Sequence, residues 1–274
     1  MKSSELGRAL EALGPYLEDL VICGAWAWYL YRRCLGPVTW MPSDFTRDID
    51  CIGHEGLAVR GETVFHRLTK GAAFVWVPRG EETPPAARFA WPNAARPEVE
   101  VEFVVPARGD GSRHVVEIQA GLTAQPLTDL EILQDSPLQI VIDDRSPLAA
   151  EMAFRGSVRV PTMGRFVVQK ALIHQRRTRD QQVKDLSYVF DLIDRENGLS
   201  DMVRHDVLSA EPRWRSEVTR FTRLLEARIT EPPFLVAMAR QFAPERAPST
   251  AYIGREIRAW LERLDAVRQE ADPD

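Results

Sequence analysis

The chain has 274 residues, a formal net charge of −5 and a hydrophobic fraction of 45%. This length predicts one large or two modest domains, and the composition is that of an ordinary globular protein. The mild acidity argues against a globally basic nucleic-acid binder but leaves room for a local basic groove. No apolar run reaches the roughly 20 residues of a membrane-spanning helix, and the N-terminus predicts no signal peptide. Cys23, Cys34 and Cys51 have no metal-binding spacing, so we expect a protein of the reducing cytoplasm.

Strand and helix patterns alternate over the first part of the chain. The expected elements in chain order are a helix over 3–19, a strand over 20–23, a helix over 25–35, a strand over 48–52, a helix over 56–72, and strands over 74–77, 88–91, 99–105, 115–118, 130–133, 138–142 and 158–161.

From about residue 164 only helical spacing remains. The expected helices cover 164–177, 180–194, 200–229 with a break near Pro212, 233–242 and 250–270. The chain therefore reads as an α+β protein: a small mixed sheet with flanking helices in a first domain over 1–162, followed by an all-helical domain over 163–274.

Two acidic residues stand two positions apart on the strand over 48–52. Side chains at i and i+2 of a strand share a face, so Asp48 and Asp50 point the same way. Aspartate is depleted in strands, and two adjacent carboxylates repel unless a cation lies between them. A hard cation such as Mg²⁺ takes oxygen ligands, so the pair is a candidate metal site. The competing interpretation is the solvated face of an edge strand.

A second strand carries a row of glutamates that alternate with apolar residues. If it lies beside the first, Glu102 completes a cluster of three carboxylates, as two-metal phosphoryl-transfer sites require. We choose Glu102 because apolar residues follow it without interruption, and Glu100, on the same face, is the second choice. The competing interpretation is the wet side of an antiparallel sheet.

A glycine follows the first predicted strand and precedes a predicted helix. The N-terminus of a helix offers free N–H groups to phosphate oxygens, and glycine permits close backbone approach. Gly24 and Ala25 are therefore candidate phosphate-binding residues. Such turns occur throughout α/β proteins, and this one gains weight from its place one helix before the paired aspartates.

A basic segment runs from 164 to 184. It contains six Lys or Arg residues against the single acid Asp180, and two of the chain's four lysines, Lys170 and Lys184, lie in it. A lysine that faces the acid cluster would pair with triphosphate oxygens, and Arg177 would hold a phosphate or an RNA backbone. Asp185 would form an ion pair or orient a lysine. A solvated charged face is the competing interpretation, and a cap at Thr178 would break the helix.

These residues together resemble the DNA-polymerase-β-like nucleotidyltransferase superfamily. The resemblance lies in Gly24-Ala25, in the run from Thr46 to Asp50, and in the acid at Glu102. The subgroup suggested is that of the AbiEii-type toxins of toxin–antitoxin systems, which carry a Thr before the first Asp and a later motif of Lys, Arg and Lys-Asp, here Lys170, Arg176-Arg177 and Lys184-Asp185. The resemblance covers about residues 20–195. The chain departs from the superfamily in having Gly-Ala where Gly-Gly or Gly-Ser is usual, and Glu as third acid where Asp is usual.

The resemblance implies a nucleotidyltransferase sheet, two Mg²⁺ (or Mn²⁺) ions on Asp48, Asp50 and Glu102, and an NTP as substrate. Gly24, Ala25, Thr46, Lys170, Arg177, Lys184 and Asp185 are the expected nucleotide-binding residues. The helical domain would complete the nucleotide cleft. The expected reaction moves an NMP to an acceptor hydroxyl on a tRNA or other RNA 3′ end, on a protein or on a small molecule, and an antitoxin is the expected protein partner. A non-catalytic nucleotide-binding or scaffold homologue of the same fold is the alternative.

Overall fold

The computed structural model describes residues 3–36, 48–78, 87–91, 99–107, 115–244 and 247–271, so the predicted nucleotide contact Thr46 lies outside the described residues. The chain divides into two compact units. The described residues up to Cys34 and those from Asp48 to Pro161 form the first unit. Leu35, Gly36 and the described residues from Thr162 onward form the second unit.

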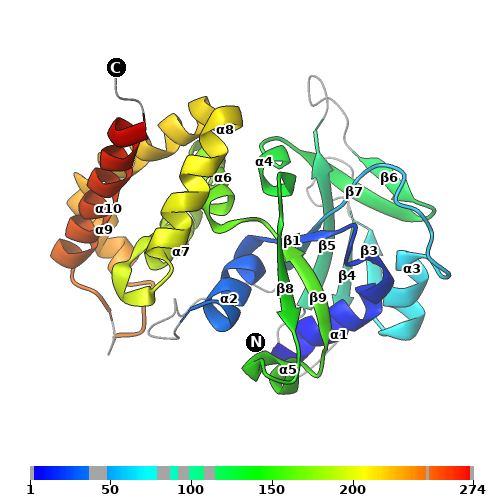
Figure 1. The fold of residues 1–274 in the computed structure, drawn as a ribbon. Helices are drawn as coiled ribbons and strands as arrows, with labels where there is room; N and C mark the ends of the chain where they lie inside the picture. The colour runs from blue at the N-terminus through cyan, green and yellow to red at the C-terminus, as the bar shows by residue number, and fades with distance from the viewer. Residues whose placement is uncertain are drawn as a thin grey trace. The chain divides into compact units, whose positions relative to one another are not determined.

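A seven-stranded mixed sheet is the centre of the first unit (Figure 1). Its main path runs β1-β2-β5-β4-β3, while β7 pairs with β5 and β6 pairs with β7. The β2–β5 and β5–β7 pairs are parallel and the other pairs are antiparallel. The strands are β1 (Val21–Cys23), β2 (Asp48–Ile52), β3 (Val75–Pro78), β4 (Ala87–Trp91), β5 (Val99–Pro106), β6 (Val116–Gln119) and β7 (Leu122–Leu127).

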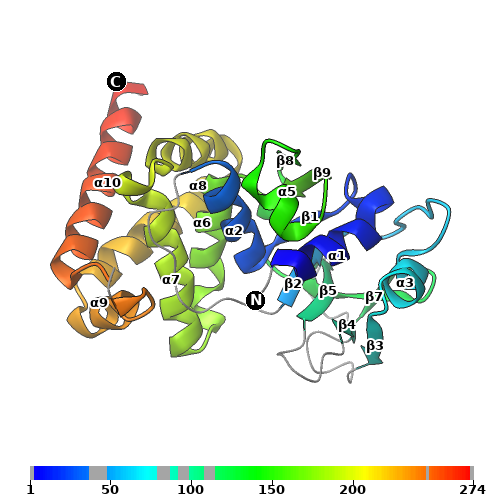
Figure 2. The ribbon, with the colours of Figure 1, turned by 90° about the horizontal axis from the view of Figure 1, so that it is seen from below.

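The register of the three strands β1, β2 and β5 brings the predicted site residues to one end of the sheet. Asp48 lies opposite Glu100, and Asp50 lies opposite Glu102. On the other side of β2, Cys23 pairs with Asp50, so the end of β1 lies next to the beginning of β2. Figure 2 shows β2, β5, β4 and β3 in succession, seen from below.

Alternation along β2 and β5 gives the sheet an apolar face. Ile49, Val101 and Phe103 are buried, whereas the acidic residues between them are only half-buried. Phe89 on β4 packs edge to face on Phe103, with ring centroids 6.0 Å apart, and Phe65 packs on Phe89 at 5.6 Å. The acidic side chains therefore lie on the face opposite this aromatic core.

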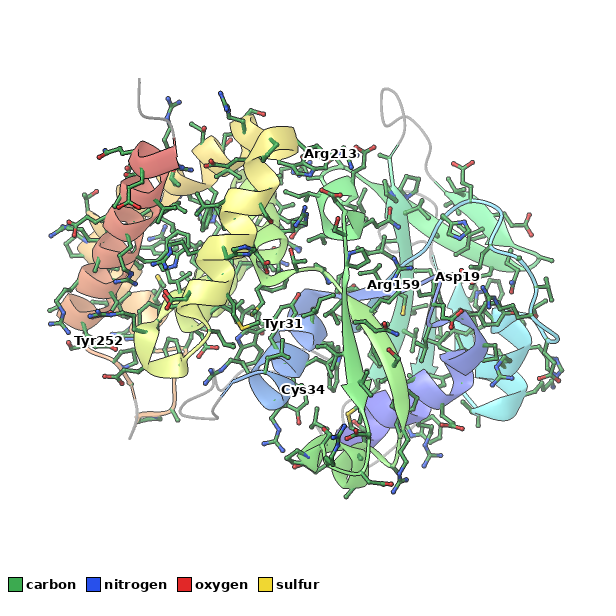
Figure 3. All side chains as sticks on the ribbon, in the orientation of Figure 1. Asp19, Tyr31, Cys34, Arg159, Arg213 and Tyr252 are labelled. Atoms are coloured by element: carbon green, nitrogen blue, oxygen red, sulfur yellow. The ribbon has the colours of Figure 1, made fainter. Side chains whose placement is uncertain are left out.

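Helices and a hairpin surround the sheet of the first unit. Tyr31 on α2 donates a hydrogen bond of 2.6 Å to the carbonyl oxygen of Pro161, just after the hairpin, and Arg159 on β9 donates to the carbonyl oxygen of Glu18 (Tyr31 and Arg159 are labelled in Figure 3). The elements are α1 (Ser3–Leu13), α2 (Gly24–Cys34), α3 (Val64–His66) continued by a π-helical turn η2 (Arg67–Gly71), α4 (Glu131–Gln134), α5 (Pro147–Met152), and the antiparallel strands β8 (Leu138–Ile142) and β9 (Gly156–Val160).

All regular elements described in the second unit are helical, and α6 packs along α8 while α10 packs on α8 and α9. The long helix α8 bends where Trp214 leaves helical geometry, at φ −121° and ψ 34°, two residues after Pro212. The helices are α6 (Met163–Ile173), a 3-10 turn η3 (His174–Arg176), α7 (Arg179–Ile193), α8 (Ser200–Ile229), α9 (Pro232–Ala239) and α10 (Thr250–Ala271).

The expected fold class is confirmed: a mixed sheet with flanking helices precedes an all-helical region. Two local predictions are wrong. The segment 130–133 contains the start of helix α4, not a strand. Its three apolar residues and Glu131 are too few for periodicity to distinguish a strand from one helical turn. The predicted helix over 56–72 begins only at Val64, where the side chain of Thr63 accepts a hydrogen bond from the His66 amide and caps the helix. Within the described residues, no helix has the length and apolarity to cross a membrane.

Candidate active site

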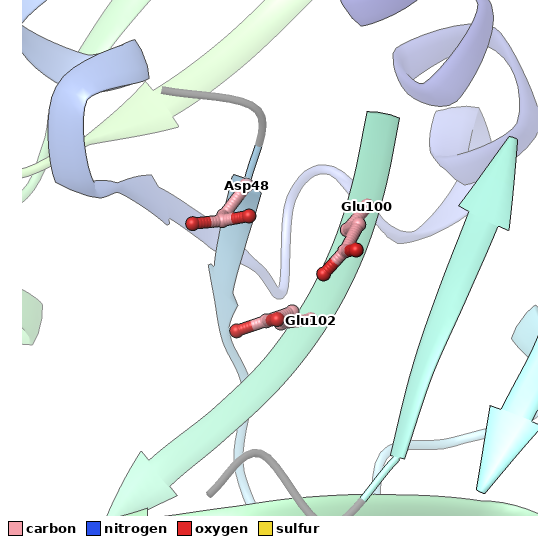
Figure 4. A group of neighbouring side chains, drawn as sticks. All are labelled: Asp48, Glu100 and Glu102. Atoms are coloured by element: carbon pink, nitrogen blue, oxygen red, sulfur yellow. The ribbon is translucent and has the colours of Figure 1, made fainter. Parts of the chain in front are cut away.

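Three carboxylates from two neighbouring strands form a cluster. One oxygen from each of Asp48, Glu100 and Glu102 lies within 4.8 Å of the others (Figure 4). Asp48 comes from β2 and both glutamates come from the parallel neighbour β5, where alternation places them on one face. Both Glu100 and Glu102, the two predicted candidates for the third acid, therefore belong to this cluster.

The cluster suits a hard divalent cation. At an effective dielectric constant of about 20, two carboxylate charges 4.8 Å apart repel by about 3 kcal/mol. Oxygen donors at this spacing are the ligand set that Mg²⁺ prefers, and strands hold them in place without loop ordering. The donor chemistry thus fits the magnesium or manganese ion that the sequence predicts.

Asp50 lies next to the glycine turn and outside this cluster of three. Gly24 begins helix α2 with φ +67°, a conformation that glycine adopts without strain. A Cβ at Gly24 would lie well inside van der Waals contact of Oδ2 of Asp50. Glycine is therefore needed twice at this turn, for its backbone angle and for the close approach of the Asp50 carboxylate.

An arginine that the sequence analysis did not single out lies beside the cluster. Arg88 on β4 is opposite Glu102 in the antiparallel register, and its guanidinium forms an ion pair with Glu100. The side chains of Arg88 and Glu100 are 20% and 12% exposed, so water screens this pair only in part. Arg88 offsets part of the negative charge that the acids create. Its only sequence signal is a basic residue within a strand of otherwise apolar residues.

The helical unit holds a second group of predicted residues. Nζ of Lys170 on α6 lies 2.9 Å from Oδ1 of Asp185 on α7, and the two side chains are 7% and 9% exposed. Nε of Arg177 lies 3.6 Å from the other oxygen, Oδ2, and the Arg177 side chain is 40% exposed. Asp185 thus forms an ion pair with Lys170, which is one of the two interpretations that the sequence offers. Lys184 precedes Asp185 on α7 and is half-buried.

The connection between α6 and α7 determines this arrangement. Thr178 and Gln181 form a reciprocal capping box that starts α7, so the predicted break at Thr178 is confirmed and Lys170 and Lys184 lie on separate helices. Nε2 of Gln182 donates to the carbonyl oxygens of His174 and Arg177, at 3.0 and 3.2 Å. The turn is therefore held by side chains, and it returns α7 against α6 so that Asp185 meets Lys170.

A buried histidine that the sequence analysis left unassigned lies one turn after Lys170. His174 is 1% exposed, and its Nε2 accepts hydrogen bonds from Nε and Nη2 of Arg228, at 3.1 and 2.9 Å. Burial first, and then the charge of Arg228, lower the pKa of His174 to about 4. The imidazole is consequently neutral at pH 7, and because Nε2 is an acceptor the proton is on Nδ1.

Comparison with known proteins gives one match. A family model described as Nucleotidyltransferase matches residues 2–197, a range that includes the carboxylate cluster, the glycine turn and the Lys170–Asp185 pair. No curated protein and no solved structure matches the chain. Family members of this kind transfer a nucleoside monophosphate from a nucleoside triphosphate. Since the match covers well over half of the sequence, the chain belongs to the nucleotidyltransferase family.

Proposed function

We propose that this protein transfers an NMP from an NTP to an acceptor hydroxyl and releases pyrophosphate. The observation that carries the proposal is the cluster of Asp48, Glu100 and Glu102 on two rigid strands, at the same end of the sheet as the glycine turn. In-line attack on the α-phosphate needs a group that accepts the hydroxyl proton and groups that neutralise charge on the phosphates. The described residues supply candidates for each of these tasks.

The carboxylates are proposed to hold one or two Mg²⁺ or Mn²⁺ ions, with Asp48, Glu100 and Glu102 as ligands and Asp50 as the further acid of the predicted set. Such an ion, when bound, would neutralise phosphate charge. We assign proton acceptance from the attacking hydroxyl to Glu102, the acid that the sequence predicts for this role. Asp50 would also fix the glycine turn, since its Oδ2 lies against Gly24.

The triphosphate is proposed to be bound by backbone and by cations. The amides of Gly24 and Ala25 at the start of α2 would hold the leaving phosphates, because the first N–H groups of a helix have no partner within the helix. Lys170, oriented by Asp185, would neutralise charge that develops on the leaving pyrophosphate. Arg177 and Lys184 are the further candidate phosphate ligands.

An RNA 3′ end is the acceptor that we propose, in line with the resemblance to AbiEii-type toxins. Arg176, Arg177 and Arg179 are exposed around the start of α7 and would bind an RNA backbone. In this proposal the acceptor is a tRNA or another RNA, and an antitoxin protein would restrain the activity. A protein or small-molecule hydroxyl remains the competing acceptor in the test below.

A non-catalytic nucleotide-binding homologue is the second candidate, and the Arg88–Glu100 ion pair favours it. Arg88 is a permanent positive charge beside the acids, so part of their negative charge is neutralised even when no metal ion is bound. Titration with Mn²⁺ separates the candidates, because an enzyme should bind nucleotide in a metal-dependent way and a scaffold should not.

The test of the enzyme proposal is a transfer assay. The protein is incubated with each α-³²P-labelled NTP, with Mg²⁺ or Mn²⁺, and with pools of total RNA, protein and small molecules. We expect label in the RNA pool, and loss of at least 100-fold in Asp48→Asn. Asp144→Asn is the matched control, because Asp144 is an exposed aspartate of the same unit whose side chain is 78% exposed. Label in no pool under any metal would contradict the proposal.

A further inference from the structure

The tautomer of His174 is determined by its surroundings. Arg228 at the end of α8 donates two hydrogen bonds, from Nε and Nη2, to Nε2 of His174. Its third nitrogen, Nη1, donates a hydrogen bond of 2.5 Å to Oε1 of Glu231. A guanidinium is always a donor, so Nε2 carries no proton and Nδ1 carries one. His174 therefore presents one neutral N–H donor.

Two complementary polar atoms lie in this buried region without a hydrogen-bond partner in the described part of the chain. They are Nδ1 of His174, a donor, and Oδ2 of Asp185, an acceptor whose nearest cation is Nε of Arg177 at 3.6 Å. Leaving a buried donor or acceptor without a partner costs about 1–3 kcal/mol. The Nδ1–H donor of His174 and the Oδ2 acceptor of Asp185 are therefore chemically suited to form a hydrogen bond with each other.

Lys170 connects His174 with Asp185, because its Nζ lies 2.9 Å from Oδ1 of Asp185 and His174 follows it on the same chain segment. Among the acids that act on the imidazole, Asp185 has a larger effect than Glu231, while Arg228 and Arg179 act in the opposite direction. His174 follows Lys170 by four residues, which is the spacing of side chains on one helix face. Phe234 of α9 also lies beside His174, and the centroids of the two rings are 6.1 Å apart.

We propose that His174 is a positioning residue for nucleotide binding: its Nδ1–H holds Oδ2 of Asp185 when Lys170 turns its ammonium group to the triphosphate. This inference rests on the proposed function, since it needs Lys170 to bind phosphate. When Lys170 shares its charge with phosphate, its hold on Oδ1 weakens, and a second donor keeps the carboxylate in place. The donor must be neutral, because an imidazolium would compete with Lys170 for Asp185. Burial and, after it, the charge of Arg228 keep the imidazole neutral.

Two substitutions separate the functions of the two ring nitrogens. His174→Asn keeps an N–H donor near the position of Nδ1 and loses the acceptor for Arg228. His174→Gln keeps an acceptor near the position of Nε2 and loses the Nδ1 donor. His205→Gln is the matched control, because His205 is exposed on α8. Unfolding in urea measures whether either His174 variant loses stability.

The measurement follows Lys170 by NMR in protein labelled with ¹³C-lysine. The chain has four lysines, so the εCH₂ signal of Lys170 is assigned by its loss in Lys170→Arg. Mg²⁺ and the α,β-methylene triphosphate analogues of the four nucleosides are titrated in, since they bind without transferring an NMP. The KM for the NTP in the transfer assay is the second readout.

We expect at least a tenfold weaker midpoint of the Lys170 shift, and at least a tenfold higher KM, in His174→Gln. His174→Asn should stay within threefold of the wild type, even if it is the less stable variant. If the wild-type Lys170 signal responds to an analogue and both His174 variants respond equally, the positioning role is wrong while the proposed function stands. If no analogue moves the wild-type signal, phosphate binding by Lys170 is wrong, and the positioning role with it.

Discussion

Removing either member of the Lys170–Asp185 pair should destabilise the helical unit, whereas removing both should cost far less than the sum. The two side chains are 7% and 9% exposed and their charged atoms are 2.9 Å apart. A buried ion that loses its partner costs about 3–5 kcal/mol, but a pair replaced by neutral side chains costs little. The double-mutant cycle of Lys170→Met and Asp185→Asn therefore tests the burial and the geometry of this pair together.

The magnitudes follow from the pairing that each variant leaves. In Asp185→Asn, the buried ammonium group of Lys170 loses the carboxylate that lies 2.9 Å away. In Lys170→Met, Asp185 retains Arg177, whose Nε lies 3.6 Å from Oδ2, so the loss is smaller. We expect about 3–4 kcal/mol for Asp185→Asn, about 2 kcal/mol for Lys170→Met and about 1 kcal/mol for the double variant.

The assay is urea unfolding at pH 7, followed by circular dichroism at 222 nm, which reports on the helices of this unit. A coupling energy of at least about 2 kcal/mol is expected, whereas independent sites add to within about 0.5 kcal/mol. Additive losses would show that the two charges are not paired in the folded protein.

Three further outcomes are expected from single sites. Gly24→Ala should lower the free energy of unfolding by about 1–2 kcal/mol and reduce NMP transfer at least tenfold, because the new Cβ displaces the Asp50 carboxylate. Gly121→Ala is the control: Gly121 also has a positive φ (+73°) but has open space for a Cβ, so this variant should lose stability and keep its transfer activity. His174 has a pKa of about 4 in the folded protein and about 6.5 in the unfolded chain, so the free energy of unfolding should fall by about 3 kcal/mol as the pH drops from 6.5 to 4. In urea unfolding measurements of His174→Asn, this loss of about 3 kcal/mol should be absent. Tyr31→Phe should lower the midpoint of thermal unfolding by a few degrees, because the buried carbonyl of Pro161 loses its 2.6 Å hydrogen bond.

Sequence reasoning identifies the parts of the site that depend on local pattern. Alternation on β2 and β5 is visible in the amino-acid sequence, and it places Glu100 and Glu102 on one face of their strand and Asp48 and Asp50 on one face of theirs. How the two faces meet depends on the register of the pair, which local pattern does not specify. The register puts both Glu100 and Glu102 in the cluster with Asp48.

Contacts between distant segments cannot be predicted from local pattern. Arg88 meets Glu100 only because β4 pairs with β5, and Arg228 meets His174 across 54 residues. A lone arginine in a strand and a lone histidine in a helix are ordinary residues in a sequence, and nothing local distinguishes them. Helix α4 is not predicted for a different reason, since a segment as short as Leu130–Leu133 fits a strand and a helical turn equally well.

The most direct test of the central claim is Mn²⁺ binding measured by electron paramagnetic resonance, in the presence of an α,β-methylene triphosphate. We expect the wild-type protein to bind Mn²⁺, and we expect Asp48→Asn, Glu100→Gln and Glu102→Gln each to weaken binding at least tenfold while Asp144→Asn does not. Equal Mn²⁺ affinity in the wild type and in the three cluster variants would mean that the acids have no part in holding the metal.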